Sequence, residues 1–168
     1  MGIEEMASGW PSTIKLLAGI VGAVAAVYTW ILTRNAALYA TFDTLYQDVL
    51  DKGLAKPHLR NPDNTSNYKA MFRGNDLVEY QTYAYMVFNV CETIADGLDF
   101  YEKRPMGFLK GLEWLIRHAF PVTADPEWLR VTWRPVLAAE KQLHGQWLED
   151  QKPGVRFKKE FLDLMKGI

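Results

Sequence analysis

The feature that most constrains this chain is an uncharged, apolar run over residues 16–33. As an α-helix these 18 residues rise about 27 Å, close to the roughly 30 Å hydrocarbon core of a bilayer. A buried core helix of this length usually keeps a polar face, and a signal peptide starts with a basic segment, whereas this chain starts with MGIEEMASG. We therefore predict a transmembrane helix over residues 15–34, preceded by a short tail over residues 1–14.

Charged and aromatic residues stand at both ends of the run. Lysine and arginine stems reach the lipid headgroups, and tryptophan and tyrosine rings favour the same depth. The predicted membrane-interface anchors are Trp10, Lys15, Tyr28, Trp30 and Arg34.

The orientation across the membrane follows from the flanking charges. The positive-inside rule weighs Lys15 on one side against Arg34 and Lys52 on the other. The short acidic tail is also easier to translocate than residues 35–168, and the single cysteine, Cys91, fits a reducing compartment. We predict the N-terminus outside and the C-terminal domain in the cytoplasm.

Small residues recur along one side of the predicted span. Close backbone approach through such residues is one of the main ways in which membrane helices associate, because lipid gives no hydrophobic drive between them. The predicted partner-binding face consists of Ala18, Gly19, Gly22, Ala23 and Ala26.

The helical spacing continues beyond the span. The apolar residues that follow it at intervals of three and four are Leu38, Phe42, Leu45 and Val49. We expect the helix to leave the membrane and run to about Lys52, where Gly53 supplies a left-handed cap. A turn-rich loop follows, with one short helix over residues 67–72.

The most regular helical pattern covers residues 77–98, and Asp76 is its expected N-cap. One broad face of this helix collects Leu77, Ala84, Val87, Phe88, Cys91, Ile94, Ala95 and Leu98. We expect this to be the central helix of the domain, with Cys91 as a core residue that is not a nucleophile.

Prolines divide the remainder of the chain. We expect a third helix over residues 108–120, and then a short helix that has Pro126 at its first position and breaks at Pro135. Further helices are expected over residues 135–150 and 157–165.

No stretch alternates convincingly with the period of a strand. The predicted fold class is therefore all-α, with one N-terminal transmembrane helix that continues into a small cytoplasmic helical bundle over residues 35–168. Removing Lys15, Glu4 and Glu5 from the 19 basic and 20 acidic residues leaves 18 of each, which lacks the basic surface that nucleic-acid binding requires. The one local basic excess, KPGVRFKK, favours a patch near a membrane or a partner.

The best candidate for chemistry is a polar cluster on the central helix, formed by Asn89, Glu92, Asp96 and Asp99. Spacings of three, four and three residues place these side chains on one side of the helix. Either they form a ligand or catalytic site, or they organise hydrogen bonds between helices, which is the more ordinary arrangement. No phosphate loop, serine elbow or kinase signature accompanies them.

Metal and cofactor binding are not expected. The three histidines lie far apart in sequence, and only Glu140 and His144 have a spacing that suits two ligands on one helix face. We interpret them as an ordinary pair on a helix surface.

Residues 83–97, YAYMVFNVCETIADG, resemble a segment of uncharacterised bacterial proteins that have one N-terminal membrane span and a small helical domain. Residues 54–69 are similar to the loop before that segment, and residues 158–165 resemble the closing helix more loosely. The resemblance implies a membrane-attached helical domain in the bacterial inner membrane. It implies no activity.

The sequence favours a function without catalysis. We expect an accessory or scaffold subunit that docks on a larger membrane protein, with the lipid bilayer and that protein as its partners and no nucleic acid. An exposed contact patch is expected around Trp128, Trp133 and Trp147. Two alternatives stay open: a homo-oligomeric sensor or effector in signalling, and a membrane-bound enzyme that uses the carboxylates of the polar cluster.

Overall fold

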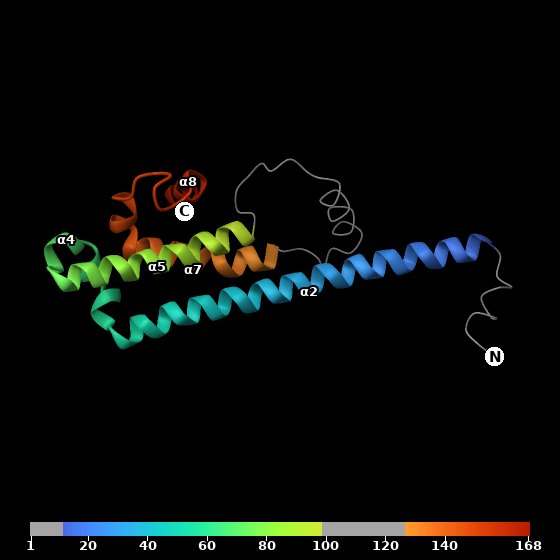
Figure 1. Ribbon diagram of the computed structural model, residues 1–168, viewed down its shortest axis with the longest axis horizontal. Helices are drawn as coiled ribbons and strands as arrows, with labels where there is room; N and C mark the ends of the chain where they lie inside the picture. The colour runs from blue at the N-terminus through green and yellow to red at the C-terminus, as the bar shows by residue number, and fades with distance from the viewer. Residues whose placement is uncertain (1–11, 99–126) are drawn as a thin grey trace. The chain divides into compact units, whose positions relative to one another are not determined.

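The computed structural model describes residues 12–98 and 127–168, and every regular element within these ranges is a helix (Figure 1). The all-α prediction is confirmed for this part of the chain. The predicted helix over residues 108–120 lies outside it, as does most of the N-terminal tail. The described residues divide into two units, residues 12–36 in the first and residues 37–98 with 127–168 in the second.

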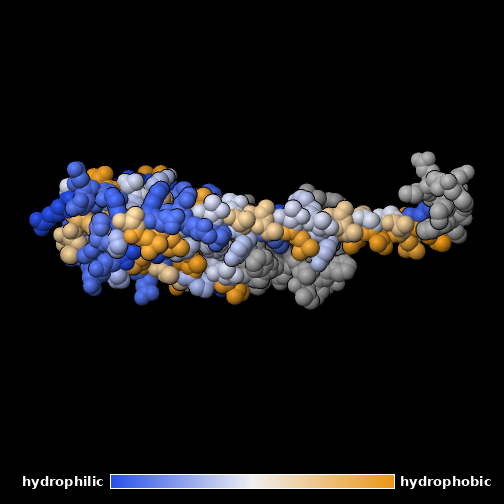
Figure 2. All heavy atoms as spheres, turned by 90° about the horizontal axis from the view of Figure 1, so that it is seen from below, coloured by the Kyte–Doolittle hydropathy of each residue, from blue (hydrophilic) through white to orange (hydrophobic). Residues whose placement is uncertain are grey.

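The first helix, α2, covers Ser12–Ala55. It contains an 18-residue window with a mean hydropathy of 2.0, none of which is buried within residues 12–98 and 127–168. Figure 2 shows hydrophobic residues along this exposed first part of α2. By length and composition α2 is able to cross a membrane, a test that the core helix of a soluble protein or a signal sequence also passes.

The end of α2 differs from the prediction. The helix passes through Gly53, which is buried and does not have the positive φ of a left-handed cap. A Cβ atom at Gly53 would lie 2.3 Å from Cδ of Arg60 and 2.6 Å from the hydroxyl oxygen of Tyr83. Gly53 therefore allows two side chains to lie against the helix backbone, and the predicted cap is wrong.

Three short helices connect α2 to the next long one: η1 (Pro57–Arg60), α3 (Pro62–Thr65) and α4 (Tyr68–Met71). The side chain of Asn61 caps α3 by accepting a hydrogen bond from the backbone N–H of Asp63 at 3.0 Å. The short helix predicted over residues 67–72 corresponds to α4.

The long helix α5 covers Asn75–Gly97 and follows Gly74, whose φ is +54°. Asp76 lies in its first turn and is not the N-cap. On the predicted apolar face, Leu77 is half-buried and every other member is buried. The periodicity of the sequence therefore identified the core face of α5 correctly.

Helix α7 covers Glu127–Glu149 and continues through Pro135, so the predicted break is wrong. A proline inside a helix leaves the carbonyl four residues earlier without its N–H donor. Here that carbonyl belongs to Val131, and both residues are exposed, so water can replace the missing donor. The last helix, α8, covers Lys159–Gly167 and buries Phe161 and Met165, close to the helix predicted over residues 157–165.

The second unit is held together by aromatic contacts between these helices. Trp133 on α7 makes an edge-to-face contact with Phe42 on α2, with ring centroids 6.0 Å apart. Trp147 stacks on Phe88 of α5 at a centroid distance of 6.0 Å. Both tryptophans are buried, so the predicted exposed patch is wrong for them, and the side chain of Trp128 lies outside the described residues.

Within this unit α5 runs antiparallel to the second part of α2. Tyr83 on α5 lies near Gly53 at the end of α2, and Gly97 at the end of α5 lies near Phe42. A Cβ atom at Gly97 would lie 2.4 Å from Cζ of Phe42, so this glycine also permits a close helix contact.

Candidate functional site

The small residues of the predicted partner-binding face lie on the exposed first part of α2. Ala18, Gly19, Gly22, Ala23 and Ala26 are all exposed. No described atom lies within 4 Å of a Cβ atom built at Gly19 or Gly22, apart from the helix backbone itself and the residues next in the chain. A second helix would therefore meet no side chain of these two residues and could approach the backbone closely.

The predicted interface anchors flank this face. Lys15 and Trp30 are exposed, and the guanidinium of Arg34 lies 5.6 Å from the centre of the Trp30 ring. A cation at this distance from a tryptophan face is attracted by its π-system. Tyr28 is half-buried, and Trp10 lies outside the described residues.

The hydroxyl groups of this part of α2 bond within the helix. Thr29 donates to the carbonyl oxygen of Ala25 at 2.9 Å, and Thr33 donates to that of Thr29 at 2.9 Å. A polar group in lipid has to be satisfied internally, because no water reaches it. These two threonines meet that requirement without a partner helix.

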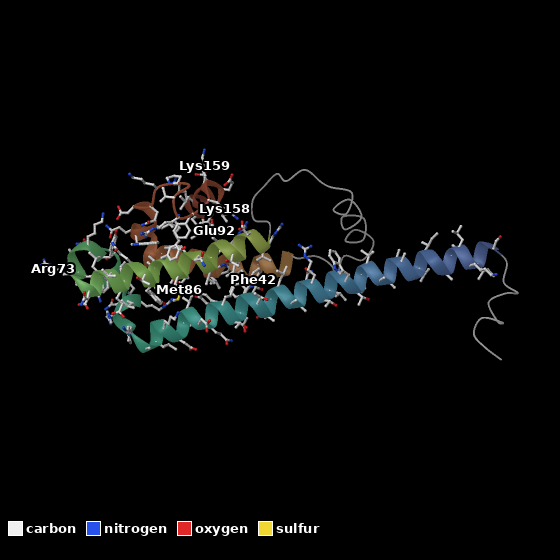
Figure 3. The ribbon with its side chains drawn as sticks, viewed as in Figure 1. Phe42, Arg73, Met86, Glu92, Lys158 and Lys159 are labelled. Carbon is white, nitrogen blue, oxygen red and sulfur yellow. The ribbon has the colours of Figure 1, made fainter. Side chains whose placement is uncertain are left out.

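The predicted polar cluster on α5 is engaged by the start of α8. Glu92 accepts a hydrogen bond from the backbone N–H of Lys158 at 2.8 Å, and the ammonium of Lys158 pairs with Asp96 (Figure 3). Lys158 is the N-cap residue of α8, so these contacts fix the beginning of that helix on α5. Asn89 is exposed, and Asp99 lies outside the described residues.

The structure shows a second polar group that the sequence analysis did not predict, a buried polar centre formed by Tyr46, Arg60, Tyr80, Tyr83, Glu140 and His144. Its core is an ion pair: one nitrogen of Arg60 lies 2.7 Å from Oε1 of Glu140, and the other lies 3.3 Å from Oε2. Tyr46 donates to the same Oε1 atom at 2.6 Å. The side chain of Glu140 is completely buried, so these donors replace water around its carboxylate.

Tyr83 joins this ion pair to the backbone of α2. Its hydroxyl accepts a hydrogen bond from Arg60 at 3.0 Å and donates to the carbonyl oxygen of Val49 at 3.1 Å. Burial raises the pKa of the Tyr83 hydroxyl, and burial followed by the hydrogen bond to Glu140 raises that of Tyr46. Both tyrosines therefore stay protonated and act as donors at neutral pH.

His144 completes the centre one turn after Glu140. Its Nδ1 atom lies 3.2 Å from the hydroxyl of Tyr80, and its Nε2 atom lies 3.8 Å from Oε2 of Glu140. Burial, and after it the charge of Arg60, lowers the pKa of His144 to about 3, so the imidazole is neutral at neutral pH. A proton on Nε2 faces the Glu140 carboxylate, and Nδ1 then accepts from Tyr80.

The interpretation of Glu140 and His144 as a surface pair is wrong. Their spacing of four residues is the same for a surface pair and a buried one, and the partner that permits burial, Arg60, comes from a different part of the chain. The guanidinium of Arg60 would also repel a cation bound between them. Among residues 12–98 and 127–168, no group of three or more acidic, histidine or cysteine side chains is placed to hold a metal ion.

The single cysteine, Cys91, is buried on α5 as predicted. Burial raises the pKa of its thiol, so it has little of the thiolate character that a nucleophile requires.

Comparison with known proteins adds no relative from which a function can be inferred. The resemblance of residues 83–97 to bacterial membrane-attached proteins therefore stays a prediction. No family model, no curated protein and no solved structure matches this chain.

Proposed function

We propose that this protein is a single-span, membrane-anchored accessory or scaffold subunit that packs on a larger membrane protein through the small-residue face of α2. The observation that carries the proposal is the apolar window of α2, none of which is buried in the part of the chain that the structure describes. Exposed apolar surface is unfavourable in water by about 25 cal/mol per Å². A bilayer removes that unfavourable term, which makes lipid the favourable surrounding for this segment.

The open glycines of α2 support a partner in addition to lipid. A simple anchor could consist of large apolar residues throughout, whereas Gly19 and Gly22 leave the helix backbone accessible. Van der Waals contact between closely spaced backbones is a principal source of helix association in membranes. The proposed partner therefore presents a helix to this side of α2.

The proposed role does not involve catalysis. Glu92 and Asp96 already bind Lys158, and Glu140 and His144 are fully buried. These contacts give each group a structural explanation that needs no substrate. The helical domain is proposed to contact the partner in the cytoplasm, with the N-terminus outside, because the positive flanks and the short acidic tail favour that orientation.

The test is affinity purification of the full-length protein from native membranes in a mild detergent. The expected result is that the protein stays in the membrane pellet after an alkaline wash, and that one membrane protein copurifies with it at a constant ratio. Gly22→Ile should weaken that association, because a branched side chain blocks the open backbone. The matched control is Val21→Ile, which enlarges an exposed residue on another side of the helix and should leave the association unchanged.

Other outcomes separate the proposal from its alternatives. Release into the supernatant by the alkaline wash would refute the span. Recovery of a lone monomer would refute the accessory role. Recovery of crosslinked copies of this chain without another protein would favour the homo-oligomeric sensor or effector.

A further inference from the structure

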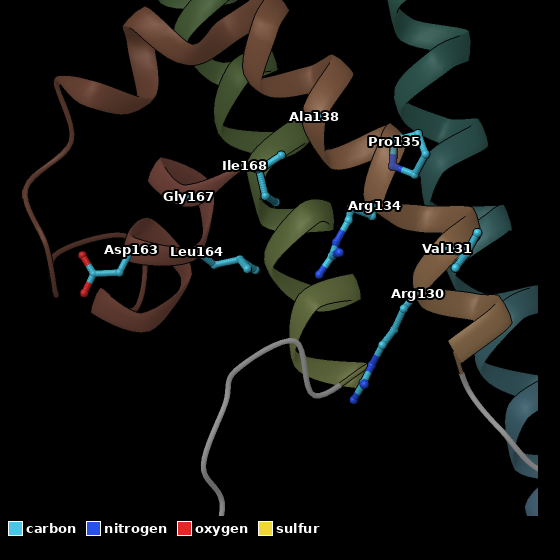
Figure 4. A pocket seen from close by; sticks show the side chains of 9 residues that line it. All are labelled: Arg130, Val131, Arg134, Pro135, Ala138, Asp163, Leu164, Gly167 and Ile168. Carbon is cyan, nitrogen blue, oxygen red and sulfur yellow. The ribbon is translucent and has the colours of Figure 1, made fainter.

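A groove lies between α7 and α8, within the second unit and away from the buried polar centre. Its volume is about 680 Å³, which is within the range of ligand-binding pockets. Figure 4 shows the side chains that line it. They include Arg130, Val131, Arg134, Asp163, Leu164 and Ile168.

Two arginines give one side of the groove a positive charge. Arg130 and Arg134 are four residues apart on α7, and in Figure 4 Arg134 extends toward Leu164 while Arg130 extends toward the end of α5. Nε of Arg130 donates to the carbonyl oxygen of Leu98 at 3.1 Å, which holds that guanidinium in place. Planar guanidinium groups bind phosphate and carboxylate through two parallel hydrogen bonds.

The rest of the groove offers an apolar surface. Val131 is 63% exposed, and Leu164 and Ile168 are half-buried. The acidic residue in the lining, Asp163, lies 3.6 Å from the ammonium of Lys166, which reduces its repulsion of an anion. A ligand with an acidic group at one end and a hydrocarbon chain would therefore match both parts.

Only a short stretch of chain separates the proposed end of the membrane span from Tyr39, which contacts the helix that carries the two arginines. The ring of Trp133, which lies on α7 between the two arginines, is 6.2 Å from the ring of Tyr39. The five residue steps from Arg34 to Tyr39 span at most about 18 Å in any conformation. Arg34 is the proposed end of the membrane span, so this step depends on the proposed function.

We propose that the groove between α7 and α8 binds an anionic lipid, with its acidic group at Arg130 and Arg134 and its acyl chain on Val131, Leu164 and Ile168. The required chemistry is an acidic group joined to an acyl chain. Both an acidic phospholipid of the membrane and a free fatty acid supply it.

The test is photocrosslinking of the full-length protein in phosphatidylcholine vesicles. Three probes carry the same photoactivatable acyl chain: phosphatidylglycerol, phosphatidylcholine and the free fatty acid. Mass spectrometry locates the labelled peptides. The expected result is about tenfold more label on α7 and α8 with an acidic probe than with phosphatidylcholine, which corresponds to about 1.4 kcal/mol of binding free energy.

Variants of the groove test its two parts. Arg130→Gln with Arg134→Gln should reduce the label to the phosphatidylcholine level. The matched control, Lys152→Gln with Lys159→Gln, removes two exposed positive charges outside the groove lining and should leave the label unchanged. If the arginine variant fails to fold, Gly167→Trp provides the test. A Cβ atom at Gly167 has open space around it, so the new ring is accommodated. The ring should reduce labelling of the groove.

The labelling pattern of the three probes distinguishes the possible ligands and tests the groove. Phosphatidylglycerol labelling supports a membrane phospholipid, and labelling by the fatty acid alone supports a free acid. Equal labelling by phosphatidylcholine, no labelling of α7 and α8, or label that neither groove variant reduces would overturn the proposal. All three probes should also label residues 15–34, so loss of that label alone refutes the span and leaves the groove supported.

Discussion

Replacing His144 with glutamine should remove most of the dependence of the domain's stability on pH between about pH 7.5 and about pH 4.5. His144 is fully buried in the polar centre beside Tyr80 and Glu140. Glutamine cannot take up a proton in this range, and it can still accept a hydrogen bond from Tyr80. The substitution therefore removes the titration and keeps a polar partner at the position.

The sign and the size of this pH dependence follow from the pKa of His144, which falls from 6.5 to about 3 on folding. Because the folded pKa is lower, the unfolded chain binds the proton first as the pH falls. The stabilisation is fully present above pH 6.5 and is lost as the pH falls toward 3. At about pH 4.5 the unfolded imidazole is protonated and the folded one is not, so the loss is about 1.4 kcal/mol for each of two pH units, or about 3 kcal/mol.

The assay is a urea titration of the full-length protein in a nonionic detergent, followed by tryptophan fluorescence at both pH values. The quantity compared is the change in unfolding free energy between the two pH values, in the natural protein and in His144→Gln. Asp150, whose pKa is lowered by hydrogen bonds from Lys69 and Tyr68, also loses stabilisation as the pH falls. Its contribution is the same in both proteins and cancels.

The matched control is His58→Gln at an exposed position, which should keep the loss seen in the natural protein. An equal loss in His144→Gln and in the natural protein would refute the reasoning, because it would show that the imidazole of His144 takes up its proton in the folded domain. If His144→Gln does not fold, His144→Phe gives the same test with a ring of similar size.

Three further substitutions and one control test the packing around the polar centre and the core. Arg60→Met should lower the free energy of unfolding by about 3–5 kcal/mol in a urea titration, because Glu140 stays buried without its cation, and a loss below about 1 kcal/mol would contradict this. Gly53→Ala should lower it by about 1–3 kcal/mol, because the new Cβ would lie 2.3 Å from a side-chain carbon. Gly145→Ala, with its nearest neighbour at 3.6 Å, should leave the melting temperature unchanged or raise it, and equal effects of the two alanines would contradict this. Trp147→Ala should lower the free energy of unfolding by about 3–5 kcal/mol by opening a cavity, which a thermal melt checks.

The sequence predicted those features that depend on neighbouring residues in one helix. The buried face of α5 was found because a buried stripe has to recur every three or four residues, whatever it packs against. The closing helix α8 was found in the same way, whereas the short helix α4 was expected only from its place after a turn-rich loop.

Features that depend on distant residues were missed. Gly53 has the sequence context of a helix end, and only the approach of Arg60 and Tyr83 explains a glycine inside the helix. A proline usually ends a helix, and α7 continues through Pro135, where Val131, the residue whose carbonyl loses its donor, is exposed. The spacing of neighbouring residues does not indicate where a distant side chain approaches. It also does not indicate whether a single turn is exposed.

The carboxylates of α5 were predicted in part, because their contacts depend on both neighbouring and distant residues. Their spacing correctly placed Glu92 and Asp96 on one side of the helix, and the more ordinary of the two interpretations, hydrogen bonding between helices, agrees with their contacts to Lys158. That lysine follows them by more than sixty residues, so no local pattern joins it to them.

The buried polar centre contributes more to the arrangement of the helices than to their net stability. Moving two charges out of water costs several kcal/mol for each ion, and their attraction inside a protein roughly offsets that cost, so the pair of Arg60 and Glu140 is close to neutral in energy. An apolar core allows one helix to slide along another with a modest loss of stability, because one methyl group replaces another in the packing contacts. If α7 slid by one turn, Glu140 would be buried away from Arg60 and Tyr46, and an unpaired buried charge costs about 3–5 kcal/mol. The pair therefore acts mainly by excluding other registers of α2, η1 and α7, and this explains why a domain with enough aromatic surface to fold still buries a glutamate completely.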